Sequence, residues 1–298
     1  TPVYFPKFAT KSSQTLRYHQ EMNNKPLKVL LDNGIFSHSE FAEPCIKEQE
    51  NFLGDMRQTL DIHGFKRKVS YKSKEYQDQI DALFTVGRLI NEKKIIAYDY
   101  IEILFERWRD FIKIPEFNAI KGCDILRCCS VLERSKFRSS VNFIDTVSKG
   151  GKKDRKSNVD LGEANQIAFF EWLNGLEKKY VDLFIQSASK IGLTDFEVIS
   201  LKNLDWFKFL CQRSGSTENF PDIFHLWTAE RNKFDVFLTL EKKLPNLLFS
   251  IKNENRQRVQ IKTKVLRPLD LLHQLGIKNP DPVPMEKDRF YYFHEVRG

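Results

Sequence analysis

The sequence lacks the features of membrane and secreted proteins. No apolar run approaches the roughly 18 residues of a membrane-spanning helix, and the chain does not start with a basic segment followed by an apolar one. The five cysteines are an odd number, and Cys128 and Cys129 are adjacent, which disfavours a complete disulfide framework. We therefore expect no membrane span, no secretory signal and a reducing, cytoplasmic setting.

Several catalytic signatures are also missing. There is no glycine-rich phosphate loop, no His-Glu-x-x-His motif and no visible Ser-His-Asp arrangement, which argues against P-loop nucleotide hydrolysis and zinc peptidase chemistry. Cys123, Cys128 and Cys129 lack the paired Cys-x-x-Cys spacing and the nearby histidine of a zinc site. No repeat recurs at a fixed period, which disfavours a solenoid.

The sequence does have apolar bulk and positive charge. Hydrophobic residues make up 41% of the 298 residues and include 25 Phe, which is enough material for a buried core. This length fits either one elaborated domain or two small ones. Lys and Arg total 48 against 40 Asp and Glu, and the resulting net charge of +8 favours a polyanionic partner such as nucleic acid.

Short apolar strands alternate with helical segments along the chain. Buried-strand patterns cover residues 27–31, 94–98, 234–239 and 259–265, and a weaker one covers residues 196–199. Helical patterns lie at residues 40–60, 77–91, 100–109, 163–191, 204–211, 223–232 and 267–272. This alternation predicts an α/β fold with a largely parallel sheet, helices on both faces and the strand carboxyl ends along one edge.

Four acidic residues follow these strands or open the helices behind them. Asp32 follows the first strand, Glu102 lies in the first turn of the helix after the second, Asp222 opens a later helix, and Glu241 lies just past a later strand. The expected topology brings these four to one edge of the sheet. Because Mg²⁺ and Mn²⁺ prefer oxygen ligands, the four acids are the candidate metal ligands and catalytic residues. Glu106, one turn after Glu102, is the alternative second acid.

Four segments of the chain resemble, in the right order, the nucleases of the PIN-domain family. KVLLDNGIF resembles the family's first strand and first acid, and IIAYDYIEILFE resembles the segment whose helix carries the second acid. DIFHLWTAERNKFDVFLTLE resembles the carboxy-terminal half, where an Asp opens a helix and a buried strand ends in Thr-x-Asp. VLRPLDLLHQLGI resembles the closing strand and helix. Residues 36–75 and 110–195 have no clear counterpart.

The resemblance implies a three-layer α/β/α PIN-like fold and a divalent-metal-dependent endoribonuclease. It makes Asp32 and Asp222 direct or water-mediated ligands of Mg²⁺ or Mn²⁺. It also makes Glu102 a ligand or water-orienting base, and Glu241 a supporting group. In this chain Glu241 stands where the family usually has Asp. The added methylene keeps the carboxylate but shifts its position.

Three polar residues near these acids are candidates for substrate contact. Asn33 and Thr239 could hydrogen-bond the carboxylates or a scissile phosphate, and His225, one turn into the Asp222 helix, could touch the substrate. Asn33 stands where the family usually has Thr or Ser. For His225, a packed or surface position is the alternative interpretation.

The resemblance and the composition together predict how the chain is organised. We expect an N-terminal extension over residues 1–25, a nuclease domain over residues 26–279 with a helical elaboration at about residues 110–195, and a tail over residues 280–298. Within the elaboration, residues 148–157 are rich in Gly, Ser and Lys, which predicts a loop.

The expected partner is RNA, with DNA left open. Basic stretches at residues 66–74, 134–138, 149–156 and 256–267 could guide a phosphate backbone towards the acids. The first alternative is a DNA nuclease of related fold, and the second is a non-catalytic RNA-binding or scaffold protein that keeps the fold. A second copy of the chain or an inhibitory protein would also be compatible as a partner.

Overall fold

The central feature of the molecule is a five-stranded parallel sheet. The computed structural model describes residues 25–53, 56–70, 72–109, 117–137, 161–250, 261–293 and 295. The strands of this sheet are β1 (Leu27–Leu31), β4 (Ile95–Asp99), β5 (Ile125–Arg127), β6 (Val236–Leu238) and β7 (Lys264–Leu266). Their order across the sheet is β5-β4-β1-β6-β7, and every neighbouring pair is parallel.

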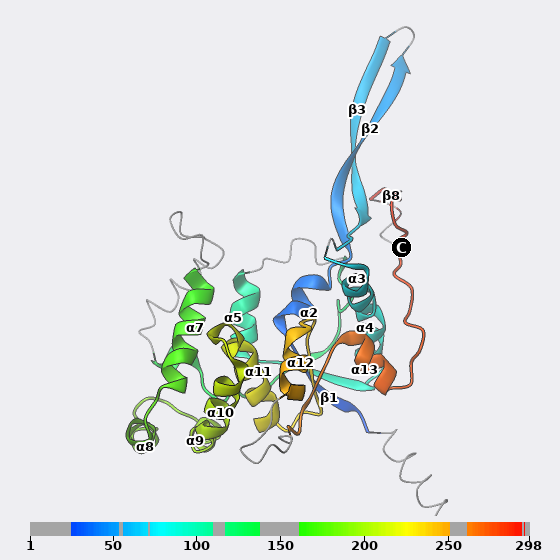
Figure 1. The fold of residues 1–298 in the computed structure, drawn as a ribbon. Helices are drawn as coiled ribbons and strands as arrows, with labels where there is room; N and C mark the ends of the chain where they lie inside the picture. Colours follow the sequence, from blue (N-terminus) through cyan, green and yellow to red (C-terminus); the bar gives the residue numbers. More distant parts are fainter. Residues whose placement is uncertain are drawn as a thin grey trace, which may run out of the picture.

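Helices flank the sheet and complete the predicted three-layer α/β/α fold, which the structure confirms (Figure 1). They are α2 (Asn33–His38), α3 (Lys74–Asp81), α4 (Leu83–Asn91), α5 (Ile101–Arg109), α7 (Leu161–Asn174), α8 (Lys178–Gln186), α9 (Asp195–Leu201), α10 (Leu204–Ser214), α11 (Phe220–Arg231), α12 (Lys243–Ser250) and α13 (Pro268–Gln274), with 3₁₀ turns η2 (Arg134–Phe137) and η3 (Thr217–Asn219). The helices α3, α4 and α13 pack together, and so do α7, α10 and α11.

The strand order places a topological switch at the middle of the sheet. From β1 the chain moves outwards through β4 to β5, and it then returns to the other side of β1 to form β6 and β7. In open α/β sheets, ligands bind outside the carboxyl ends of the strands where the winding direction reverses. The fold therefore predicts a ligand site at the carboxyl ends of β1 and β6.

The core explains why the strands were recognisable in the sequence. Leu30 and Leu31 of β1 and Phe237 of β6 are fully buried, as is Trp227 of α11. Strands covered on both faces by helices need near-continuous apolar runs. The expected strands at residues 27–31, 94–98 and 234–239 are accordingly confirmed as β1, β4 and β6.

A long hairpin replaces the helix that we expect at about residues 40–60, so that prediction is wrong. The strands β2 (Ala42–Leu53) and β3 (Met56–Arg67) pair antiparallel over their whole length, and Figure 1 shows the hairpin projecting from the body. The strand β8 (Phe290–Tyr291), in the expected tail, pairs with the base of β3. A Cβ at Gly64 would overlap the Phe290 ring, so glycine allows this close approach.

Two other expectations need correction. The weaker strand expected at residues 196–199 is wrong, because these residues lie in helix α9. There the Thr194 hydroxyl accepts from the Glu197 backbone N–H at 3.2 Å, and the Glu197 carboxylate accepts from the Thr194 N–H at 2.8 Å. This capping box starts a helix and outweighs the strand preference of Val198 and Ile199. Inside the expected helical elaboration, β5 adds a strand to the central sheet.

Parts of the earlier expectations fall outside the described residues. These are most of the N-terminal extension (residues 1–24), the loop at residues 148–157 and residues 256–260 of the basic stretch at residues 256–267. Across the described helices, none combines the length and apolar character needed to cross a membrane. All five cysteines are free thiols.

Candidate functional site

Asp32 lies at the switch point and is held there by β6. Its backbone N–H donates to the Leu238 carbonyl at 3.0 Å, and its Oδ2 accepts a 2.7 Å hydrogen bond from the Thr239 hydroxyl. Both Asp32 and Thr239 are buried. Thr239 therefore acts as a support for the carboxylate, one of the two contacts that the sequence left open. The Asn33 backbone N–H also bonds this carboxylate.

Glu106 and His225 come together with Asp32. One possible ligand atom from each of the three lies within 4.8 Å of the other two, and all three residues are buried. Glu106 is on α5 and His225 is on α11, so three separate elements supply the cluster. His225 Nε2 lies 3.1 Å from Glu106 Oε1, and its Nδ1 lies 2.5 Å from the Tyr100 hydroxyl. We call Asp32, Glu106 and His225 the central cluster.

Glu102 pairs with an arginine and is not a member of the central cluster. Its Oε1 lies 2.6 Å from an Arg134 guanidinium nitrogen, and both side chains are almost completely buried. Glu106, the alternative second acid, is the α5 carboxylate that reaches the central cluster. The two acids are linked through the Gln166 amide, which donates to Glu106 at 2.5 Å and to Glu102 at 3.4 Å.

Asp222 acts on the cluster through its charge, and the charge of Glu241 acts on Asp222. Asp222 lies in the first turn of α11, one turn before His225. The pKa of Asp222 is influenced by the charges of Asp32, His225, Glu106 and Glu241, so its carboxylate lies within electrostatic reach of all of them. Glu241 is exposed, and its backbone N–H donates to the Thr239 hydroxyl at 3.0 Å.

Burial and mutual repulsion raise the proton affinity of the acids. Burial, followed by the charge of Asp32, raises the pKa of Asp222 from 3.8 to about 7. Burial also raises the pKa of Asp32, against the opposing attraction of His225. The pKa of Glu102 is raised by burial although Arg134 opposes the shift.

His225 is the cation that balances this group. Burial would lower the pKa of its imidazole, but the neighbouring carboxylates, Glu106 above all, raise it to about 9. When no other cation is bound, these carboxylates therefore favour the protonated form of the ring. Several buried carboxylates surround this ring, so positive charge at the site is stabilised.

The residues present fit a divalent cation. Asp32, Glu106 and the nearby Asp222 offer the carboxylate oxygens that Mg²⁺ and Mn²⁺ prefer, and His225 adds an imidazole nitrogen once its proton leaves. A bound cation would replace the positive charge that protonated His225 otherwise supplies to the carboxylates.

Sequence reasoning missed part of this arrangement. Gln166 and Arg134 lie in the segment without a counterpart in the family resemblance, so no pattern linked them to Glu106 and Glu102. A signal for His225 was available, because it lies three residues after Asp222 and residues at that spacing share a helix face. The same spacing rule put Glu102 and Glu106 on one face and could not choose between them.

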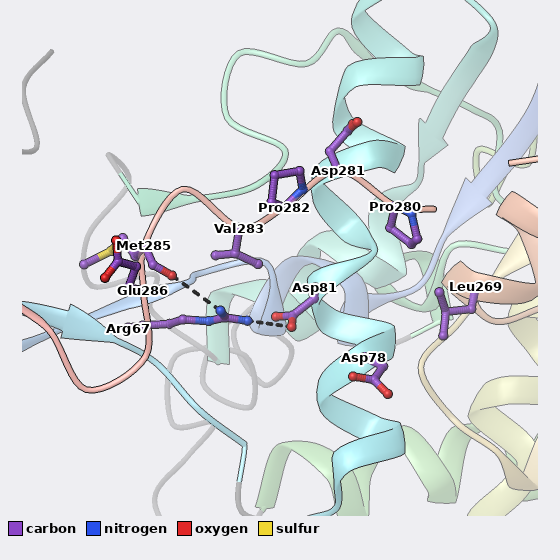
Figure 2. A pocket seen from close by; sticks show the side chains of 10 residues that line it. All are labelled: Arg67, Asp78, Asp81, Leu269, Pro280, Asp281, Pro282, Val283, Met285 and Glu286. Atoms are coloured by element: carbon purple, nitrogen blue, oxygen red, sulfur yellow. Dashed lines mark hydrogen bonds and ion pairs between the residues drawn. The ribbon is translucent and has the colours of Figure 1, made fainter. Parts of the chain in front are cut away.

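A separate cavity of about 550 Å³ lies away from these acids. Figure 2 shows its lining at the base of the hairpin, where Arg67 pairs with Asp81 at 2.5 Å and donates to the Met285 carbonyl at 3.4 Å. Asp281 and Glu286 also line it. The cavity joins β3, α3 and the segment before β8, and its described lining contains no member of the central cluster.

No family model, curated protein or solved structure matches the chain. The resemblance to PIN-domain nucleases consequently rests on the sequence segments that carry it. The geometry of the central cluster does not depend on that resemblance, because it comes from the strand order and from the residues of α5 and α11 that meet Asp32.

Proposed function

We propose that this protein is a divalent-metal-dependent nuclease that hydrolyses phosphodiester bonds of RNA. The observation that carries the proposal is the approach of Asp32, Glu106 and His225 to within 4.8 Å at the switch point of the sheet, with Asp222 in electrostatic reach. Ligands of open α/β sheets bind at this place, and a cluster of carboxylates is suited to hold the cation that such hydrolysis uses.

Each residue has a role that follows from its position. Asp32, Glu106 and Asp222 would hold Mg²⁺ or Mn²⁺, and the bound cation would supply a hydroxide nucleophile and neutralise charge on the phosphate. Thr239 fixes Asp32 through its 2.7 Å hydrogen bond, and Gln166 fixes Glu106. These supports keep the carboxylates oriented in the way that outer residues orient metal ligands.

His225 can move a proton at the site. Its Nδ1 is held by the Tyr100 hydroxyl, which leaves Nε2 facing Glu106 as the position that gains or loses a proton. The ring can therefore serve as a ligand when neutral or as a proton donor when charged. Its burial beside Glu106 favours this role over the direct substrate contact considered from the sequence.

The substrate class rests on charge and on the resemblance. A net charge of +8 favours a polyanion, and the PIN-like segments favour RNA over DNA. The five free cysteines suit a reducing cytoplasm, which is where we place the activity. A DNA nuclease is the closest rival, and a non-catalytic RNA-binding protein is the rival from another class.

Cleavage assays with matched variants test this proposal. A labelled RNA is incubated with Mn²⁺, with Mg²⁺ or with EDTA, using the wild type, Asp32→Asn and Asp222→Asn. We expect each variant to lose at least about 100-fold in rate, because a ligand carboxylate is removed, and EDTA to abolish cleavage. Asp124→Asn makes the same isosteric change at an exposed acid just before β5 and should keep the wild-type rate.

The same assay separates the rivals. Faster cleavage of a DNA strand of the same sequence would replace RNA by DNA as the substrate. RNA bound but left intact with every cation would support the non-catalytic alternative. Wild-type rates in both Asp32→Asn and Asp222→Asn would remove the acids from the chemistry altogether.

A further inference from the structure

The carboxyl edge of the sheet has basic residues at its two ends. Arg127 ends β5, Asp99 ends β4, Asp32 follows β1, Thr239 follows β6 and Arg267 follows β7. The strand order turns these five into one row with acids and a hydroxyl between two arginines. Because neighbouring strands are about 4.8 Å apart, the two arginine backbones are separated by roughly 19 Å.

At the β5 end, two arginines share one carboxylate. Arg127 Nε donates to Asp99 Oδ1 at 2.6 Å, and Arg107 donates to Asp99 Oδ2 at 3.4 Å. Asp99 is buried, while about half of the Arg127 side chain is exposed. Burial, and then the repulsion of Arg127, lower the pKa of Arg107 against the attraction of Asp99. This end therefore carries a surplus positive charge that a bound anion would relieve.

Arg107, the second cation at this end, lies on the helix that carries Glu106. It follows Glu106 directly on α5, and its guanidinium carbon lies 4.1 Å from the centre of the Phe36 ring. Phe36 belongs to α2, which begins immediately after Asp32. Stacking on an aromatic ring fixes the plane of a guanidinium and leaves its edge available for hydrogen bonds. The Arg107 guanidinium thus packs on α2, the helix that begins at the residue after Asp32.

At the β7 end, a second carboxylate is shared by two cations. Arg267 pairs with Glu75, and the Lys242 ammonium lies 4.0 Å from the same carboxylate. Arg267 is buried and so holds Glu75 in place, whereas Lys242 is 70% exposed and directly follows Glu241. Lys72, also exposed, lies 4.4 Å from the centre of the Tyr76 ring on the adjacent α3.

Arg127, Arg107 and Lys242 lie outside the basic stretches noted in the sequence, whereas Lys72 and Arg267 lie within two of them. In the described parts of those stretches, Arg67 pairs with Asp81 and Arg134 pairs with Glu102, and Lys136 lies 2.6 Å from Glu197. These three side chains join elements of the fold. The sequence stretches therefore did not point to Arg127, Arg107 or Lys242.

We propose that a nucleic-acid backbone lies along this carboxyl edge, with phosphates bound by Arg127 and Arg107 at one end and by Lys242 at the other. The inference rests on the proposed function, since it places the phosphodiester between them at the central cluster. An arginine pair presents several N–H donors to phosphate oxygens in a fixed plane, whereas lysine acts as a point charge.

Binding measurements without catalysis test the proposal. Fluorescence anisotropy of a short labelled single-stranded RNA is followed in EDTA at stepped salt concentrations for the wild type, Arg127→Gln, Lys242→Gln and the double variant. Each phosphate contact on a single strand contributes about 0.7 to the slope of log K against log salt. We expect each single variant to reduce the slope by about 0.7 and the double variant by about 1.4.

Two controls make the outcome specific. Lys93→Gln removes a 65% exposed cation just before β4, at the opposite edge of the sheet, and should leave binding and slope unchanged. Arg127→Lys keeps the charge and should retain most of the slope, which separates phosphate binding from a loss of folding around Asp99. Equal slopes for Arg127→Gln, Lys242→Gln and Lys93→Gln, or no RNA binding by the wild type, would overturn the proposal.

The proposed binding edge and the proposed nuclease activity can be disproved separately. Cleavage that needs Asp32, together with unchanged binding by the edge variants, would remove the proposed path of the backbone and keep the nuclease. Weakened binding by the edge variants, without cleavage of RNA or DNA by the wild type, would keep the binding edge and remove the nuclease.

Discussion

The central sheet and the β2–β3 hairpin are both built of strands, yet they place their residues in opposite surroundings. Leu30 of β1 is fully buried between helices. On the hairpin, Ile46 is 58% exposed and Phe52 is 71% exposed. Helices cover the sheet, whereas both faces of the outer hairpin are open to solvent (Figure 1).

This difference decides where unusual chemistry can arise. At the sheet edge, burial raises the pKa values of Asp32 and Asp222, and the charge of Asp32 raises the pKa of Asp222 further. On the hairpin, Arg57 and Glu50 form an ion pair with 64% and 44% of their side chains exposed. Exposed pairs exchange readily with water and contribute little, while buried ones are costly to disturb. Charged residues therefore affect stability and pKa values more at the sheet edge than on the hairpin.

Breaking one buried and one exposed arginine–glutamate pair should give the largest difference in the free energy of unfolding. Arg134→Leu leaves Glu102 buried without its cation, and we expect it to lower the free energy of unfolding by about 3–5 kcal/mol. Arg57→Leu on the hairpin should change it by less than about 1 kcal/mol. Urea unfolding of both variants measures the difference, and similar losses for the two would contradict it.

The contrast extends to apolar side chains. Leu30→Ala opens a cavity in the sheet core and should cost about 2–5 kcal/mol. Leu60→Ala makes the same change at a hairpin side chain that is 40% exposed, and it should cost less than about 0.5 kcal/mol. Thermal and urea unfolding provide the comparison. A large loss from Leu60→Ala would show that the hairpin is covered in solution.

A smaller effect should appear in the dependence of stability on pH. The pKa of Asp222 is raised from 3.8 to about 7 in the folded chain, mainly by burial. The folded state therefore binds this proton more tightly than the unfolded state does. The stability that the proton contributes is complete below pH 3.8 and is lost as the pH rises through about 7.

Asp222→Asn removes that titration and isolates its contribution. In EDTA, the unfolding free energy of the wild type should fall relative to the variant by about 1 kcal/mol per pH unit across this interval. Urea unfolding at pH 5, 6, 7 and 8 would measure the difference. A constant difference across the series would mean that the Asp222 carboxylate ionises normally.

The sequence predicted the sheet better than the hairpin for a physical reason. Strands buried on both faces carry apolar runs, and residues 27–31 and 234–239 show them clearly. The outer hairpin has no buried face, so its residues follow no alternation that could distinguish strand from helix. The available signal was the Gly54-Asp55 dipeptide between the two strands, a pair common in hairpin turns.

The candidate site was predictable in outline only. Asp32 and Asp222 follow from strand ends and helix starts, which fix backbone positions that a sequence pattern can locate. Which α5 acid reaches them depends on Arg134, which engages Glu102 and leaves Glu106 to the cluster. That arginine comes from a distant segment whose placement only the assembled fold determines. The roles of Gln166 and His225 depend on the same tertiary packing.

The position of a bound cation would show whether the carboxylates of the central cluster hold a metal. Crystals of the protein soaked in Mn²⁺ would be measured at a wavelength where manganese scatters anomalously. We expect an anomalous peak in contact with the Asp32 and Glu106 carboxylates, and its loss in Asp32→Asn crystals. A fully soaked crystal with no peak at these carboxylates, or with manganese bound only elsewhere, would contradict it.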